Sequence, residues 1–361
     1  MTSTSTKQPI PQEEPAPPQE SYLQLFLRFL RFGFLAWGGP MAQIAMLRQE
    51  LVDEERWVSS ERFNRVLAVY QALPGPEATE LCVYFGIVAR GRNGAVLAGL
   101  GFLLPGFVLM FLLSWFYVTY GINSPLFTGI FYGFQAAVAA LIVRAVHRIG
   151  GHALNDWWLW GIAILAGIAQ LLGVNFLITL STAGLAYAIV KRQLPTLPHA
   201  AAFLPFSLFM QPAALATPGL LALFGYGLRS GLLTFGGAYT VIPFLQHDAV
   251  INGGWMTNQQ FLDGLALSSI LPAPLIIFST FVGYLGGGPL GAIALTVGIF
   301  LPAFAFTLIG HTFFEKVVEN KAAHAFLDGV TAGVVGLIAA TTIGLFRTAV
   351  PDWPALIIFA V

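Results

Sequence analysis

Two arginines stand at matching places in otherwise apolar stretches of the chain. Arg31 and Arg229 are 198 residues apart, and each precedes a Gly-Gly pair by about two helical turns. A guanidinium group binds oxyanions through two parallel hydrogen bonds. The two side chains together could neutralise a dianion, and we therefore predict that both bind a substrate anion. The alternative is that each long side chain reaches to water at the surface of an apolar layer.

The apolar stretches are interrupted at four places, which form two matched pairs. Proline lacks an amide hydrogen and clashes with the preceding turn, so a helix ends before it and restarts after it. The restarted helix presents unpaired amides and the positive end of its dipole, which favour an anion. The alternative is that the glycines only permit close helix packing and the prolines only kink. We predict that the backbone at these breaks binds the anion, at Gly38, Gly39, Pro74, Gly75, Gly236, Gly237, Pro272 and Ala273.

Two carboxylates follow one of these breaks. Glu77 comes directly after Pro76, and Glu80 lies one turn further along on the same helix face. A carboxylate in a low-dielectric site binds a proton more readily than one in water, so we predict proton coupling at Glu77 and Glu80. The plainer interpretation of Glu77 is a first-turn carboxylate that complements the helix dipole.

The composition around these residues is that of a membrane protein. Of the 361 residues, 9% are charged and 57% are hydrophobic, and the mean hydropathy is +0.75. A soluble domain carries roughly 25% charged residues. Two uncharged runs of 51 residues, 93–143 and 264–314, are each long enough for two crossings of ~20 residues. Neither run alternates in polarity as barrel strands do, so we predict an all-α polytopic membrane protein with discontinuous helices.

An internal repeat relates the two halves of the chain. At an offset of 198 residues, Phe26, Arg31, Gly33 and Trp57 match identical residues, and the Gly-Gly and Pro-x-Pro units recur. The offset falls to 197 and then 196 further along, as insertions or deletions in loops would produce. We therefore predict two homologous repeats, the second of which is short at its C-terminal end.

The positive charges predict that the two repeats have opposite orientations. In the first repeat, arginines flank the uncharged helix pair and the turn between these helices has no charge. In the second repeat the corresponding turn holds Lys316 and Lys321. Because positively charged loops face the cytoplasm, the reversal indicates inverted repeats, as in many secondary transporters. Parallel duplication is the alternative, and the number of crossings in each repeat is left open.

The predicted organisation has four parts. Residues 1–21 are rich in proline and have no apolar run, which predicts a disordered tail. The first membrane repeat spans 22–192, a linker spans 193–221, and the second membrane repeat spans 222–361.

Several classes of protein and site are excluded. The 17 basic and 17 acidic residues balance, so no basic field attracts nucleic acid. A single cysteine, Cys82, excludes a multi-cysteine metal site, the histidines lack ligand spacing, and there is no P-loop. We predict no nucleic-acid partner, no metal and no cofactor. Without a catalytic constellation the chain is not expected to be an enzyme. The lipid bilayer is its expected partner, and a homodimer is left open.

The motifs at the breaks carry a family resemblance. They are Phe32-Gly33-Phe34-x-x-Trp37-Gly38-Gly39-Pro40, Trp57, Gln71-Ala72-Leu73-Pro74-Gly75-Pro76, Thr234-Phe235-Gly236-Gly237-Ala238-Tyr239 and Leu271-Pro272-Ala273-Pro274. These motifs resemble those of the chromate ion transporter family, whose long members have two homologous halves of opposite orientation. The resemblance covers nearly the whole chain after the tail. It implies that chromate, an oxyanion shaped like sulfate, is expelled from the cytoplasm by the membrane potential or the proton gradient.

Two other functions within transport stay open at this point. Sulfate has the charge and nearly the size of chromate, so the sequence does not separate the two oxyanions. A passive anion channel would share the arginines and the helix ends but would not need Glu77 or Glu80. All three functions place the chain in a bacterial-type inner or plasma membrane as a multi-pass protein.

Overall fold

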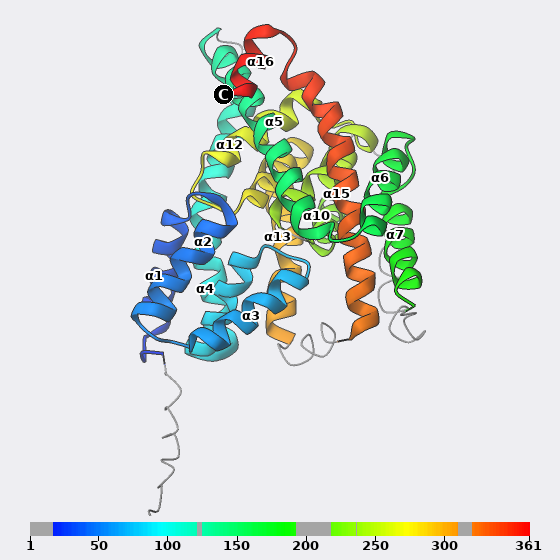
Figure 1. The fold of residues 1–361 in the computed structure, drawn as a ribbon. Coiled ribbons are helices and arrows are strands. Elements are labelled where there is room, and N and C mark those ends of the chain that lie inside the picture. The colour runs from blue at the N-terminus through cyan, green and yellow to red at the C-terminus, as the bar shows by residue number, and fades with distance from the viewer. Residues whose placement is uncertain (1–16, 121–124, 193–217, 236, 310–319) are drawn as a thin grey trace, which may run out of the picture.

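The computed structural model describes residues 17–120, 125–192, 218–235, 237–309 and 320–361 (Figure 1). Most of the predicted N-terminal tail, most of the predicted linker and Gly236 therefore lie outside the described residues. The described part is helical and contains no strand. This confirms the prediction of an all-α protein.

The first repeat begins with short helices and continues with long ones. Its elements are α1 (Tyr22–Leu35), α2 (Gly39–Arg48), the π-helix η1 (Gln49–Glu54), α3 (Ser60–Ala72), α4 (Glu77–Tyr120), α5 (Pro125–Ala153), α6 (Trp157–Leu171) and α7 (Phe176–Val190).

The second repeat follows the same order. Its elements are α10 (Leu220–Leu232), the 3-10 helix η2 (Ala238–Val241), α11 (Ile242–Gln246), the π-helix η3 (His247–Asn252), α12 (Asn258–Ser269), the 3-10 helix η4 (Leu275–Phe278), α13 (Ser279–Ile309), α15 (Lys321–Ala349) and α16 (Trp353–Ala360).

The repeat extends to the backbone conformation. The long helix α4 is kinked at Arg90 (φ −145°, ψ 25°) and Gly91 (φ 61°, ψ −152°). Its counterpart α13 is kinked at Gly287 (φ −156°, ψ 24°) and Gly288 (φ 62°, ψ −153°). Both repeats also place a π-helix after the first break, and α5 and α15 each have 29 residues. The predicted duplication is therefore present in the fold.

The four predicted breaks fall where helices end. The helix α1 ends at Leu35, and α2 starts at Gly39. The helix α3 ends at Ala72, and α4 starts at Glu77. The matching gaps separate α10 from η2 and α12 from η4.

Within the described residues, four helices are long and apolar enough to cross a membrane. They are Glu77–Tyr120, Phe127–Ala153, Leu275–Ile309 and Lys321–Ala349. Three shorter apolar helices, α6, α7 and α10, accompany them. The chain is a multi-pass membrane protein.

The two repeats meet along α4 and α13, which run antiparallel. Gly99 of α4 lies against the ring of Phe304 in α13. Further along α4, the Tyr117 ring packs edge-on against Phe281 of α13 with centroids 4.9 Å apart. The residue numbers rise along one helix as they fall along the other, so these equivalent helices point in opposite directions.

Candidate functional site

A cavity of about 540 Å³ lies between the two repeats. The first repeat lines it with the start of α2, the end of α3, Glu77 and the C-terminal part of α5. The second repeat contributes the break at Phe235 and Gly237 and the N-terminal part of α15. Met41 on its rim is 61% exposed, so the cavity is accessible from the surface. A residue of the second glycine break and residues that follow two breaks of the first repeat thus border one space.

Arg148 is the principal cation of this cavity. It comes from α5 and lines the cavity together with His152, one turn further along. The ring Nδ1 of His152 lies 2.8 Å from the carbonyl oxygen of Arg148, so this nitrogen donates to the backbone. The Arg148 guanidinium forms no hydrogen bond or ion pair with any residue that the structure describes. Its donors are therefore available to an anion in the cavity.

A histidine and a carboxylate from the second repeat line the same cavity as Arg148. His324 and Asp328 of α15 both line it, and the His324 Nδ1 lies 3.1 Å from an Asp328 carboxylate oxygen. The His324 side chain is 58% exposed. The cavity thus gathers one guanidinium, two imidazoles and the carboxylates of Glu77 and Asp328 around one space. The guanidinium is the group among them that is suited to bind an oxyanion.

The two carboxylates after the Pro-Gly-Pro break lie at and beneath the wall of this cavity. Glu77 lines it and is near enough to Arg148 for the two charges to interact. Glu80 is fully buried, and neither of its carboxylate oxygens has a hydrogen-bond partner among the described residues. A Cβ at Gly75 would lie 2.8 Å from Glu80 Oε1. The glycine therefore lets Glu80 approach the break closely.

The glycine breaks lie beside the cavity in conformations that disfavour other residues. Gly38 (φ 88°) and Gly39 (φ 80°) precede Pro40, which lines the cavity, and Gly237 (φ 112°) lines it directly. The Gly75 amide donates to the carbonyl oxygen of Thr234 at 2.9 Å, which ties the Pro-Gly-Pro break to the second glycine break.

The second Pro-x-Pro break is packed against the helix α4. Ala273 is 6% exposed. A Cβ at Gly106 of α4 would lie 2.4 Å from the Ala273 methyl group. Pro272 and Ala273 do not line the cavity. The structure brings Gly75 and Gly237 to the cavity region and leaves Pro272 and Ala273 in the α4 interface.

Replacing Gly39 or Gly237 by alanine should impair transport through the backbone. A Cβ at either site would meet no atom within 4 Å, but both φ values are positive, which costs an L-residue ~1–2 kcal/mol. We expect both variants to insert and fold but to lose most transport, because the break changes its conformation. Gly161 lies in α6 with equal room and no positive φ, so Gly161→Ala is the control and should transport normally. Full activity of both break variants would contradict a role for these conformations.

The predicted anion-binding arginines are both engaged elsewhere. Arg31 forms an ion pair with Glu50 of η1, and Arg229 forms one with Asp248 of η3. Each partner lies 19 residues after its arginine, so the same ion pair occurs in both repeats. Neither arginine lines the cavity. The repetition of the arginine therefore has a structural reason: it joins the first helix of each repeat to its π-helix.

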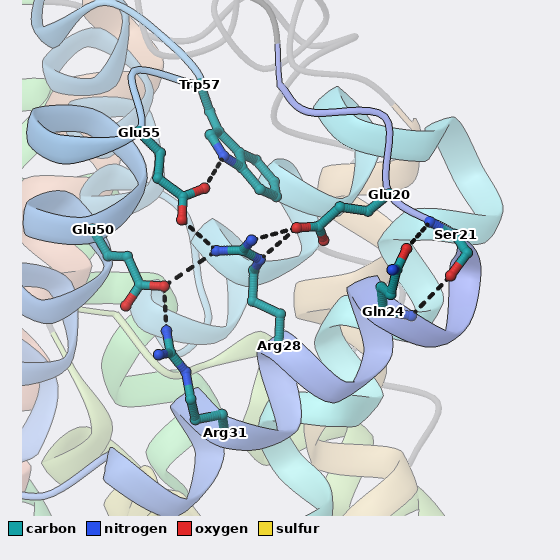
Figure 2. A network of polar contacts seen from close by, with 8 residues as sticks. All are labelled: Glu20, Ser21, Gln24, Arg28, Arg31, Glu50, Glu55 and Trp57. Atoms are coloured by element: carbon teal, nitrogen blue, oxygen red, sulfur yellow. Dashed lines mark hydrogen bonds and ion pairs between the residues drawn. The ribbon is translucent and has the colours of Figure 1, made fainter.

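In the first repeat this ion pair belongs to a larger polar network (Figure 2). Arg28 bonds Glu55 at 2.6 Å and Glu50 at 3.2 Å, and it also contacts Glu20. The Trp57 indole donates to the other Glu55 oxygen at 2.8 Å. The network fixes α1 against η1.

The residues that the sequence argument missed are Arg148, His152 and His324. Arg148 appeared only as one of several basic residues marking a cytoplasmic end, and the histidines lacked metal-ligand spacing. The matched pairs Arg31–Glu50 and Arg229–Asp248 were visible in the repeat register. This register could have separated structural arginines from Arg148, whose counterpart in α15 is Gly344.

A multi-pass helical bundle with two homologous repeats and a cavity between them that contains charged side chains defines a membrane transporter. The model of the chromate transporter family matches residues 23–189 and 221–361. The chain belongs to the chromate transporter family. This membership confirms the family predicted from the motifs and agrees with a protein that is not an enzyme.

Similar proteins cover nearly the whole chain. A chromate transport protein of Pseudomonas aeruginosa is 59% identical over 95% of this chain and 85% of its own length. A probable chromate transport protein of Synechococcus elongatus is 31% identical over 94% of this chain and 88% of its own length. A chromate transport protein of Cupriavidus metallidurans is 30% identical over 94% of this chain and 86% of its own length. No solved structure matches the chain.

Proposed function

We propose that this protein is a secondary transporter that exports chromate from the cytoplasm, with the cavity between the repeats as the binding site. The observation that carries the proposal is the Arg148 guanidinium in a cavity bordered by both repeats. A dianion needs donors that also carry positive charge, and a planar guanidinium supplies two parallel bonds. We take chromate as the oxyanion because two of the similar proteins are named chromate transport proteins.

The anion is held by groups from both repeats in this proposal. Arg148 provides the main charge, and the break at Gly237 provides backbone amides. The amides that start α2, after Gly38, add the positive end of a helix dipole. A direct role for Arg31 or Arg229 would require its ion pair with Glu50 or Asp248 to open.

We further propose that the two repeats are inverted in the membrane. The antiparallel course of α4 and α13 supports this orientation. The arginines at the C-terminal end of α5, Arg144 and Arg148, place that end at the cytoplasm by the positive-inside rule. The cavity then faces the cytoplasm, as an exporter that loads its substrate there requires.

Proton coupling is assigned to Glu77 and Glu80. An ionised Glu77 competes with the anion for Arg148, so a proton on Glu77 favours anion binding. An ionised carboxylate without partners is strongly disfavoured in an apolar interior, so the buried Glu80 is suited to hold a proton. The membrane potential also acts on a dianion directly, at ~2.3 kcal/mol per charge for each 100 mV. The driving force is the proton gradient or the membrane potential.

Chromate flux measured with the purified protein in liposomes distinguishes these two driving forces. We expect chromate flux under an imposed potential and an additional flux under an imposed pH gradient. Glu80→Gln should keep the first and lose the second, because the amide cannot exchange a proton. The control is Glu61→Gln, since Glu61 pairs with Arg65 on the exposed face of α3. A Glu80→Gln protein with an unchanged response to the pH gradient would refute the coupling role.

Competing anions test the substrate in the same liposomes. Sulfate that competes with chromate but is not itself carried would support chromate as the cargo. Equal transport of both would make the protein a general exporter of tetrahedral oxyanions. Absence of chromate flux under either gradient would refute the proposed function.

A further inference from the structure

The repeat register assigns a counterpart to the cavity elsewhere in the molecule. The helix α3 corresponds to α12 at an offset of 198, and α15 corresponds to α5 at an offset of 196. The cavity lies between α3 and α15. Its counterpart is therefore the junction of α12 with the N-terminal part of α5. Figure 1 shows α3 toward one end of the molecule and α12 toward the other.

The two equivalent places differ in packing. Ala68 of α3 lines the cavity and is exposed, whereas its counterpart Ala266 in α12 is 1% exposed. Leu327 of α15 lines the cavity and is half-buried, whereas its counterpart Phe131 in α5 is 9% exposed. The helices α3 and α15 thus lie apart at the cavity, whereas the equivalent helices α12 and α5 pack closely against each other.

A buried polar cluster joins the closed junction. Asp263 of α12 is 2% exposed. Its two carboxylate oxygens accept from Tyr117 Oη of α4 at 2.8 Å and from Gln135 Nε2 of α5 at 2.6 Å. The Tyr117 ring also packs edge-on against Phe131, with centroids 6.0 Å apart.

Among the residues that the structure describes, no comparable polar cluster joins the cavity side. The counterpart of Asp263 is Arg65, which is exposed and pairs with Glu61 on its own helix. The counterpart of Gln135 is Thr331, which lines the cavity. The polar contact across the junction is therefore specific to one side.

We propose that the α5–α12 junction is a second access route, closed in this structure, and that Asp263 with Tyr117 and Gln135 is its gate. Two homologous repeats that adopt different packing can exchange their arrangements, which alternates access to a site between them. Opening the gate then closes α3 onto α15. The inference rests on the proposed transport function, because it describes how the anion leaves the cavity.

Thiol labelling tests the gate without any substrate. Cys82 is buried and is first replaced by alanine. Single cysteines are then introduced by Leu327→Cys and Phe131→Cys, and a membrane-impermeant maleimide is applied to right-side-out and inverted vesicles. The thiol at position 327 should react from one face, and the thiol at position 131 should react slowly. Adding Tyr117→Phe should raise labelling at 131 about tenfold from the opposite face and lower labelling at 327.

The control is Tyr187→Phe, which removes a Tyr–Asp hydrogen bond of the same 2.8 Å length in α7 and should change neither position. Gln135→Leu is the second gate variant and should act as Tyr117→Phe does. Three outcomes would overturn the proposal. They are a rise in labelling at position 131 without a fall at position 327, labelling of both positions from the same face, and no change in labelling in either gate variant. Reciprocal labelling without chromate flux would refute the transport function alone, whereas chromate flux without reciprocal labelling would refute the gate alone.

Discussion

Replacing Arg148 by glutamine should nearly abolish chromate transport. Arg148 lines the cavity without an ion pair to any described residue, so its charge is available to the dianion. Removing one partner of a hydrogen-bonded charge pair costs ~2–5 kcal/mol. The cavity is open at the surface of the molecule, where Met41 is 61% exposed, so we expect the lower end, a loss of about 30-fold in initial flux. The measurement is chromate uptake into inverted vesicles at matched protein amounts.

Two further variants serve as comparisons for this prediction. Arg148→Lys keeps the charge but loses the planar fork, so it should transport at an intermediate rate. Arg144→Gln removes the same side chain one turn earlier on α5, where it does not line the cavity, and should have a much smaller effect. Equal losses in Arg144→Gln and Arg148→Gln would indicate a general effect of positive charge at this end of α5. Such a result would contradict an anion site at Arg148.

Replacing Arg229 by alanine should destabilise the whole protein, although its repeat counterpart Arg31 should tolerate the same change. The side chains of Arg229 and Asp248 are 8% and 1% exposed. The variant leaves the buried Asp248 carboxylate without its guanidinium partner and with only the His247 ring, 3.5 Å away, and the loss of one partner of a buried ion pair costs ~3–5 kcal/mol. The Arg31 side chain is 52% exposed, and a solvent-exposed ion pair contributes ~0–1 kcal/mol. Thermal unfolding in detergent should show a large fall for Arg229→Ala and a small one for Arg31→Ala.

A double variant separates charge burial from packing. In Arg229→Met with Asp248→Leu, both buried charges are gone and the volume is largely kept, so much of the stability should return. The Arg229 guanidinium also lies over the rings of Phe176 and Tyr226, at 5.1 and 5.4 Å from their centroids. A methionine can keep part of this contact. Equal stability of Arg31→Ala and Arg229→Ala would show that burial does not separate the two ion pairs.

The polar residues were harder to assign from the sequence than the apolar ones. A repeated arginine near a helix break has the same pattern whether it binds an anion or an acid 19 residues away. Glu50 and Asp248 lie in the short π-helices η1 and η3, and their local sequence pattern does not identify them as partners. The structure gives each arginine an acidic partner, Glu50 for Arg31 and Asp248 for Arg229.

The sequence by itself determined the membrane class, the helical content, the duplication and the positions of the breaks at the two Gly-Gly and two Pro-x-Pro units. These features depend on local chemistry: few charges, long apolar runs, and glycine and proline where a helix cannot continue. The family was equally accessible, because its motifs are contiguous. Only the tertiary structure decided which polar groups share a space. Arg148, His324 and Gly237 are far apart in the chain, and the packing of α5, α15 and the second glycine break brings them to one cavity. The closed junction at Asp263 could not be predicted from the sequence either. The two repeats share a sequence pattern but pack differently, and no local signal specifies which side is closed.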